Sequence, residues 1–167
     1  LHPLSGSGQW NLKLKEARWH QMNLGLLECR GRYQPDALVV EPLRAATKET
    51  SFAARLNWTG SALRVDKLVL EQWGHPVLGG EITLPLARDA TGVHWAEQSE
   101  VAGGLKAVNL DLATLLATNG KPSPLSGSVQ FALQLAGTPN APSAMLRLDA
   151  TKLRSPQTPK FGEVSIK

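Results

Sequence analysis

The sequence predicts a mainly β protein of about ten strands with one short helix. Three observations favour this fold class. Apolar and polar residues alternate along most of the chain, turn-forming residues interrupt the alternation at short intervals, and one short passage occurs twice. With 167 residues, the chain is long enough for one domain with a hydrophobic core or for part of an elongated repeat structure.

Alternation with a period of two is typical of a strand that has one dry face and one wet face. The apolar members of the clearest runs are Trp10, Leu12 and Leu14; Phe52, Ala54, Leu56 and Trp58; Ile82, Leu84 and Leu86; Val129, Phe131, Leu133 and Leu135; and Ala144, Leu146, Leu148 and Ala150. Near Arg64 the apolar positions change parity, from that of Val65 to that of Leu68. A β-bulge would explain the change, and so would a different strand register.

Glycine and proline separate the alternating runs. Glycine supplies positive φ at tight turns, and proline fixes φ and removes a backbone hydrogen-bond donor. These residues predict turns at 31–32, 34–36, 59–61, 74–76, 88–92 and 139–142. Turns at such short intervals are typical of an all-β chain.

One segment, residues 108–117, departs from the alternation. Leu112, Leu115 and Leu116 have helical spacing. Either Asn109 or Asp111 is placed to cap the first turn, and residues 119–120 (Asn-Gly) are placed to end the helix. The sequence therefore predicts a helix of about two turns near residues 109–117.

A five-residue passage occurs twice: Pro3–Ser7 has the same sequence as Pro124–Ser128, and each copy leads into an alternating strand. A repeat favours a modular, elongated architecture. We expect two continuous parts, a β-repeat segment over residues 1–107 and a short helix with a further β-repeat segment over 108–167. The chain begins without Met, so we expect it to be a fragment of a longer protein.

Composition narrows the class of partner but does not fix the compartment. The net charge is +4, but basic residues such as Lys13 and Lys15 alternate with apolar ones instead of forming a dense patch, which argues against nucleic acid as a partner. Cys29 is the one cysteine, so no intrachain disulfide can form. No apolar run approaches the roughly 18–20 residues that span a bilayer, and no signal peptide is recognisable.

The residues that could carry chemistry do not form a recognisable constellation. The four histidines are scattered without metal-ligand spacing, and no nucleophile elbow or phosphate-binding loop is present. Carboxylates such as Asp36 and Asp89 fall in turns. We therefore expect no catalytic residue, no metal site and no cofactor, and the chain is interpreted as non-enzymatic. A hydrolase on a β scaffold is the remaining catalytic hypothesis, because spatial neighbours need not be sequence neighbours.

Residues 108–167 follow a more specific pattern. The helix 110–116 (Leu-Asp-Leu-Ala-Thr-Leu-Leu) precedes a Ser-Gly turn, an alternating strand, the passage Gly137–Pro142, and a second alternating strand. This order resembles the TamB and AsmA-like family of Gram-negative envelope proteins. The match is best over 108–167, and in residues 1–107 it rests on general texture and on the repeated passage.

The resemblance implies an elongated, curved antiparallel sheet folded lengthwise into an open groove (a β-taco) with an apolar interior. It also implies a periplasmic location, with the parent protein anchored in the inner membrane. Members of the family take part in phospholipid transport between the inner and outer membranes or in the assembly of outer-membrane proteins. The implied partners are phospholipid or acyl chains, a BamA-like outer-membrane barrel protein and nascent outer-membrane proteins.

A sheet with one apolar face that curls without closing leaves a trough in which acyl chains or apolar strand faces can lie. The predicted groove residues are Trp10, Leu12, Leu14, Phe52, Leu56, Val129, Phe131, Leu133, Leu135, Leu146 and Leu148. The same residues would also describe the core of a closed barrel. The alternative function is a β-sandwich binding module, of carbohydrate-binding or adhesin type, with a two-sheet core and a platform of exposed aromatic residues.

Overall fold

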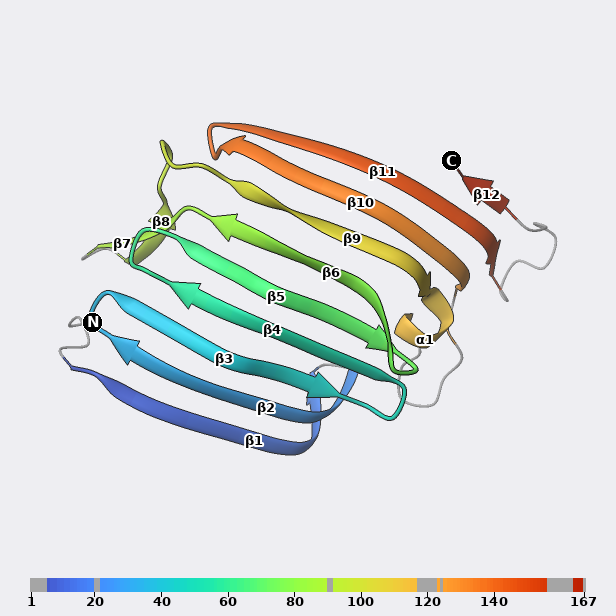
Figure 1. The fold of residues 1–167 in the computed structure, drawn as a ribbon, viewed down its shortest axis with the longest axis horizontal. Helices are drawn as coiled ribbons and strands as arrows, with labels where there is room; N and C mark the ends of the chain where they lie inside the picture. The colour runs from blue at the N-terminus through green and yellow to red at the C-terminus, as the bar shows by residue number, and fades with distance from the viewer. Residues whose placement is uncertain are drawn as a thin grey trace.

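The computed structural model describes residues 6–19, 22–89, 92–116, 123, 125–155 and 164–166, and it confirms the mainly β class. One open antiparallel sheet of ten strands dominates the molecule (Figure 1). In spatial order its strands are β1 (Gly8–Trp19), β2 (Met22–Gln34), β3 (Ala37–Ala46), β4 (Thr50–Trp58), β5 (Leu63–Gln72), β6 (His75–Leu84), β9 (Ala102–Asp111), β10 (Ser126–Thr138), β11 (Ala141–Arg154) and β12 (Val164–Ile166).

The chain runs through the sheet as a meander, because most strands pair with their neighbours in sequence. The one departure is a separate hairpin of β7 (Leu86–Asp89) and β8 (Gly92–Trp95). In sequence this hairpin lies between β6 and β9, which pair directly with each other in the large sheet. The boundary predicted between residues 107 and 108 falls inside β9, so both predicted segments contribute to one sheet.

Most of the predicted turns lie between strands, but the turn predicted at residues 31–32 is wrong. Strand β2 runs through these residues, and Gly31 pairs with Trp10 on one side and Val40 on the other. Gly31 serves packing instead of chain reversal. A Cβ atom at Gly31 would lie 2.3 Å from ring atoms of Trp10, so the indole occupies the space that a side chain would need.

The β-bulge considered near Arg64 is present in β5, where three residue steps from Val65 to Leu68 oppose two steps in β6. Lys67 is the inserted residue and has a φ of 51°. Equivalent insertions occur in alternate strands of the sheet, at Glu16 in β1, at 41–42 in β3, at Asn109 in β9 and at Lys152 in β11. Because each bulge adds one residue to one strand, it increases local twist and bends the sheet.

The predicted helix is confirmed, and its described part is α1 (Leu112–Leu116). Of the two predicted caps, Asp111 fills the role, because its carboxylate accepts hydrogen bonds from the backbone N–H groups of Ala113 (3.2 Å) and Thr114 (3.1 Å). Asn109 instead lies in β9, so the helix begins later than predicted. The predicted end at residues 119–120 lies outside the described residues. No helix in the described part of the chain has the length and apolar character to span a membrane.

The hydrophobic core is small for a sheet of this size. Val77, Ala107 and Leu110 form its centre, at the end of the sheet near α1, and Leu70 and Phe131 are among the partly buried residues packed against them. Few other apolar side chains in the described residues are buried. A single sheet without a second layer leaves one face of apolar side chains in contact with solvent.

Candidate apolar binding face

The strand register gathers apolar side chains on one face of the large sheet. Directly paired residues of neighbouring strands project to the same face, so a chain of pairs traces a row across the sheet. One such row crosses nine strands and contains only apolar residues: Leu14, Leu27, Ala45, Phe52, Leu70, Leu78, Ala107, Phe131 and Leu148. This row defines what we call the apolar face.

Further rows on the same face have the same character. A second row across the nine strands contains no polar side chain: Trp10, Gly31, Val40, Leu56, Val65, Ile82, Gly103, Leu135 and Ala144. Between the two rows lie Leu12, Cys29, Leu43 and Ala54 on β1 to β4, and Leu68, Gly80, Leu105, Leu133 and Leu146 on β5 to β11. The apolar face is therefore continuous from one side of the sheet to the other.

All eleven predicted groove residues lie on this face. They belong to β1, β4, β10 and β11. Ten of them stand in the rows described above, and the remaining one, Val129 on β10, pairs with Leu110 and Ala150 on the same face. The prediction missed apolar residues on the strands in between, among them Leu27, Leu70 and Leu105. A bulge hides Leu70, because a simple count of parity from one end of β5 fails beyond the inserted Lys67. A count that restarts at each parity change would have found Leu70.

Exposure on the apolar face is greatest toward the two sides of the sheet. Trp10, Leu12 and Leu14 on β1 are exposed, and so are Leu146 and Leu148 on β11, with Leu146 at 59%. The six predicted residues on β4 and β10 are half-buried. Apart from the large sheet, the described residues contain only α1 and the β7–β8 hairpin as regular elements, so no second sheet covers this face.

The β7–β8 hairpin is attached at one end of the strands. The indole Nε1 of Trp58, a residue on the apolar face, donates a hydrogen bond to the carbonyl oxygen of Leu86 at 2.9 Å. The backbone N–H of Ala96 donates to the carbonyl of the buried Pro85 at 2.8 Å, which closes the hairpin at its base. These two contacts hold the hairpin beside the apolar face, and Figure 1 shows it at the opposite end of the strands from α1.

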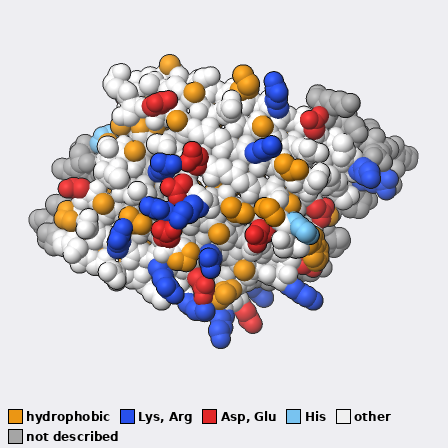
Figure 2. Space-filling model, in the orientation of Figure 1, with side chains coloured by type: hydrophobic (Ala, Val, Ile, Leu, Met, Phe, Trp, Pro, Cys, Tyr) orange, Lys and Arg blue, Asp and Glu red, His pale blue; other side chains and the backbone are white. Residues whose placement is uncertain are grey.

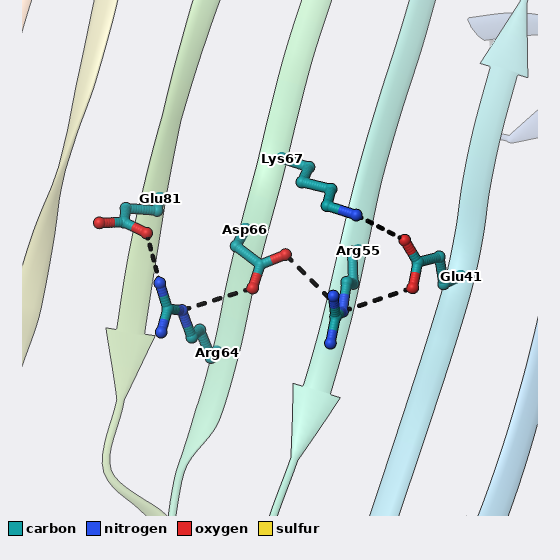
Figure 3. Close-up of polar contacts among 6 residues, drawn as sticks. All are labelled: Glu41, Arg55, Arg64, Asp66, Lys67 and Glu81. Atoms are coloured by element: carbon teal, nitrogen blue, oxygen red, sulfur yellow. Dashed lines mark hydrogen bonds and ion pairs between the residues drawn. The ribbon is translucent and has the colours of Figure 1, made fainter.

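The opposite face of the sheet is polar, and Figure 2 shows basic and acidic side chains interspersed over its central strands. An ion-pair network crosses β3 to β6 there, with three carboxylates and three cationic groups: Glu41, Asp66, Glu81, Arg55, Arg64 and Lys67 (Figure 3). The closest nitrogen–oxygen distances are 2.7 Å for Arg64–Glu81 and 2.9 Å for Lys67–Glu41. The network neutralises its own charge.

Glu41 and Cys29 are among the groups whose pKa is shifted. The hydrogen bond from Lys67 is the main cause that lowers the pKa of the Glu41 carboxyl. Burial raises the pKa of the Cys29 thiol, which lies on the apolar face. A raised thiol pKa disfavours the thiolate, so Cys29 behaves as a small apolar residue. Among the described residues no cluster of His, Cys, Asp and Glu could hold a metal ion.

Comparison of this chain with protein-family models, with curated proteins and with solved structures finds no match.

Proposed function

We propose that the apolar face binds the acyl chains of phospholipids, as part of a non-enzymatic periplasmic protein of the TamB and AsmA-like type that transports phospholipid between the inner and outer membranes. The observation that supports this proposal most directly is the pair of rows that cross nine strands without a polar side chain. Soluble proteins rarely leave so continuous an apolar surface without a ligand or partner.

The dimensions of the face suit an acyl chain. Eight steps between neighbouring strands, at about 4.8 Å each, give a row of about 38 Å. Half of the roughly 30 Å hydrocarbon core of a bilayer is about 15 Å, which approximates the reach of one lipid tail. A row is thus long enough for more than one tail laid end to end, as a conduit requires.

A second candidate function is the assembly of outer-membrane proteins, and the outer edge of β1 favours it. In the described residues this edge has no paired strand, and β1 presents Trp10, Leu12 and Leu14 on the apolar side with Lys13 on the polar side. An incoming strand of a nascent barrel has the same alternation and could pair by β-augmentation. A BamA-like barrel protein would then be the partner that receives the strand.

The other hypotheses from the sequence receive less support. A β-sandwich module requires a second packed sheet, whereas the described residues form one large sheet and a two-stranded hairpin. The aromatic platform of a carbohydrate-binding module requires several coplanar exposed rings. Trp73 and Trp95 are exposed, but they belong to a turn and to the small hairpin.

The test is native mass spectrometry of the chain after expression in a lipid-containing host, with extraction and identification of any bound molecule. Two neighbouring residues of β11 provide a matched pair of variants. Leu146 and Met145 have exposures of 59% and 61%, but Leu146 lies on the apolar face and Met145 on the polar face. Leu146→Asp should abolish bound phospholipid or fatty acid, and Met145→Asp should retain it.

A wild-type chain that is free of lipid and does not bind a hydrophobic dye would overturn acyl-chain binding by this face. Equal loss of lipid in both variants would also contradict the proposal, because it would show dependence on β11 as a strand and not on its apolar side. A Leu133→Asp variant gives a second measurement at the position that pairs with Leu146.

A further inference from the structure

The polar face is hollowed over β1, β2 and β3. Two adjoining cavities of about 600 Å³ and 360 Å³ open there, and both are lined by Asn11, Arg30 and Glu41. We call the two cavities together the β1–β3 cleft. Its charged residues are Lys13, Glu28, Arg30, Arg32, Glu41 and Arg44. Figure 2 shows basic side chains gathered along this side of the polar face, over the strands drawn lowest in Figure 1.

Both carboxylates of the cleft already have cationic partners. Glu28 forms an ion pair with Lys13 across β1 and β2. Glu41 accepts a hydrogen bond from Lys67 at 2.9 Å and lies 3.5 Å from the Nε atom of Arg55. The hydrogen bonds from Lys13 and Lys67 lower the pKa values of Glu28 and Glu41, respectively. Both carboxylates are therefore ionised and compensated at neutral pH.

The three arginines of the cleft differ in this respect. Within the described residues, Arg30, Arg32 and Arg44 have no hydrogen-bonded or ion-paired carboxylate, although the neighbouring network over β3 to β6 is balanced. Arg30 and Arg44 act on Glu28, and Arg32 acts on Glu41, only as lesser Coulombic causes of the lowered carboxyl pKa values. The cleft thus has three guanidinium groups in excess of its ion pairs. A concave surface with uncompensated positive charge attracts anions, because its low-dielectric walls concentrate the field.

The strand register places Arg30 between the other two arginines, so that Arg30 lines both cavities while Arg32 lines the larger and Arg44 the smaller. Arg30 and Arg32 lie two positions apart on β2 and are therefore about 7 Å apart on the same face. Arg44 on β3 pairs with Glu28, so it stands diagonally across from Arg30 at about 7–8 Å. Side chains as long as arginine can converge over such distances. The planar guanidinium donates paired N–H groups that match the oxygens of phosphate.

We propose that the β1–β3 cleft is a binding site for a phosphate group, held by Arg30, Arg32 and Arg44, with the Asn11 amide as a further donor. The ligand is a phosphate ester, which either a soluble molecule or the headgroup of a phospholipid can supply. The site lies on the face opposite the apolar rows, so it does not depend on acyl-chain binding.

The experiment is titration of the chain with glycerol 3-phosphate, followed by calorimetry and by NMR of the arginine side-chain N–H groups. Saturable binding is expected, with shifts of the signals of the three arginines. Arg30→Gln, Arg32→Gln and Arg44→Gln should each weaken binding about tenfold or more, because each removes charge-assisted hydrogen bonds. Arg30→Lys should recover only part of the loss, since lysine keeps the positive charge but lacks the paired N–H donors of the planar guanidinium.

Arg147→Gln is the control. Arg147 is an exposed arginine on the same polar face, paired with Ala132 at the other side of the sheet. Its replacement should leave the affinity unchanged. Absence of saturable binding, or an equal loss with Arg147→Gln, would overturn the proposal. Thermal unfolding of each variant identifies any loss of fold, and three separate arginine variants keep the test available if one of them unfolds.

A second arm identifies the source of the phosphate. Vesicles of phosphatidylglycerol are compared with glycerol 3-phosphate at the same ionic strength, because exposed charge interactions weaken with salt. If the chain binds both the vesicles and glycerol 3-phosphate, and Arg30→Gln loses both activities, a lipid headgroup is supported as the ligand. Binding of glycerol 3-phosphate alone supports a soluble ester. Leu146→Asp should bind phosphate normally, so failure of this site and failure of the apolar face can be told apart.

Discussion

The side-chain amide of Gln72 makes two hydrogen bonds with the backbone of Asp111. Gln72 Nε2 donates to the Asp111 carbonyl at 3.0 Å, and the Asp111 N–H donates to Gln72 Oε1 at 2.9 Å. Gln72 is only 3% exposed. Strand β6 lies between β5 and β9, so Gln72 and Asp111 do not belong to paired strands. The Gln72 amide instead takes the place of a strand partner for Asp111, at the point where β9 ends and α1 begins.

We expect Gln72→Leu to destabilise the chain by about 1–3 kcal/mol, because it leaves a partly buried donor and a partly buried acceptor of Asp111 without their partner. Denaturant unfolding monitored by circular dichroism measures the loss. Gln130→Leu is the control, because the Gln130 amide is exposed and has one long contact, at 3.4 Å, with Asn109. A loss no larger than that of Gln130→Leu would show that water can replace the amide.

We expect Gly31→Ala to cost about 1–3 kcal/mol, because the new methyl group would overlap the indole of Trp10. Gly6→Ala should be close to neutral, since nothing lies within 4 Å of a Cβ atom there. Thermal unfolding compares the two variants. If the overlap is the cause, the Gly31→Ala change should cost less in a Trp10→Ala background than in the wild type, and equal costs would refute it.

We expect Trp58→Phe to loosen the β7–β8 hairpin, because it removes the hydrogen bond to the Leu86 carbonyl and leaves the ring packing largely intact. The loss should be about 1 kcal/mol. Hydrogen exchange of the Ala96 amide, which bonds to Pro85 at the base of the hairpin, should become faster. The exposed Trp73 provides the comparison, and Trp73→Phe should leave this exchange rate unchanged.

The lowered pKa of Glu41 predicts the direction of an acid effect. The folded pKa lies below the ordinary value of 4.5, mainly because Lys67 donates a hydrogen bond to the carboxylate. The contribution to stability is therefore complete above pH 4.5 and is lost as the pH falls through the folded value. Urea unfolding across this range should show Glu41→Gln less stable than wild type near pH 7, with the difference closing in acid. A constant difference would contradict the linkage.

Local features of the fold could be predicted from sequence. Alternation identified the strands that contain Leu133 and Leu146, the parity change near Arg64 indicated the bulge at Lys67, and Asp111 was one of two predicted caps. Each of these signals lies within a few residues of the feature it predicts, so no knowledge of tertiary contacts is needed.

Features that depend on distant contacts could not be predicted. Gln72 lies beside a turn, where a polar residue is expected to be exposed. It is instead buried and bonded to Asp111, which lies 39 positions away in the sequence. The β1–β3 cleft has the same origin. Arg30, Arg32 and Arg44 are spread over fifteen residues of sequence, and only the pairing of β2 with β3 brings them to one surface. Alternation predicts the face of the sheet on which a residue lies, but it does not predict which residues of other strands lie beside it.

The bulges of alternate strands make the hairpin of two strands, one with an inserted residue and one without, the natural unit of growth for this sheet. Removal of β3 and β4 together would place β5, which has an insertion, next to β2, as β3 is now. Removal of β3 alone would make β2 and β4 neighbours that run in the same direction, because β3 is antiparallel to both, and a short turn cannot join parallel strands. Changes in the length of such a chain during evolution are therefore expected in pairs of strands.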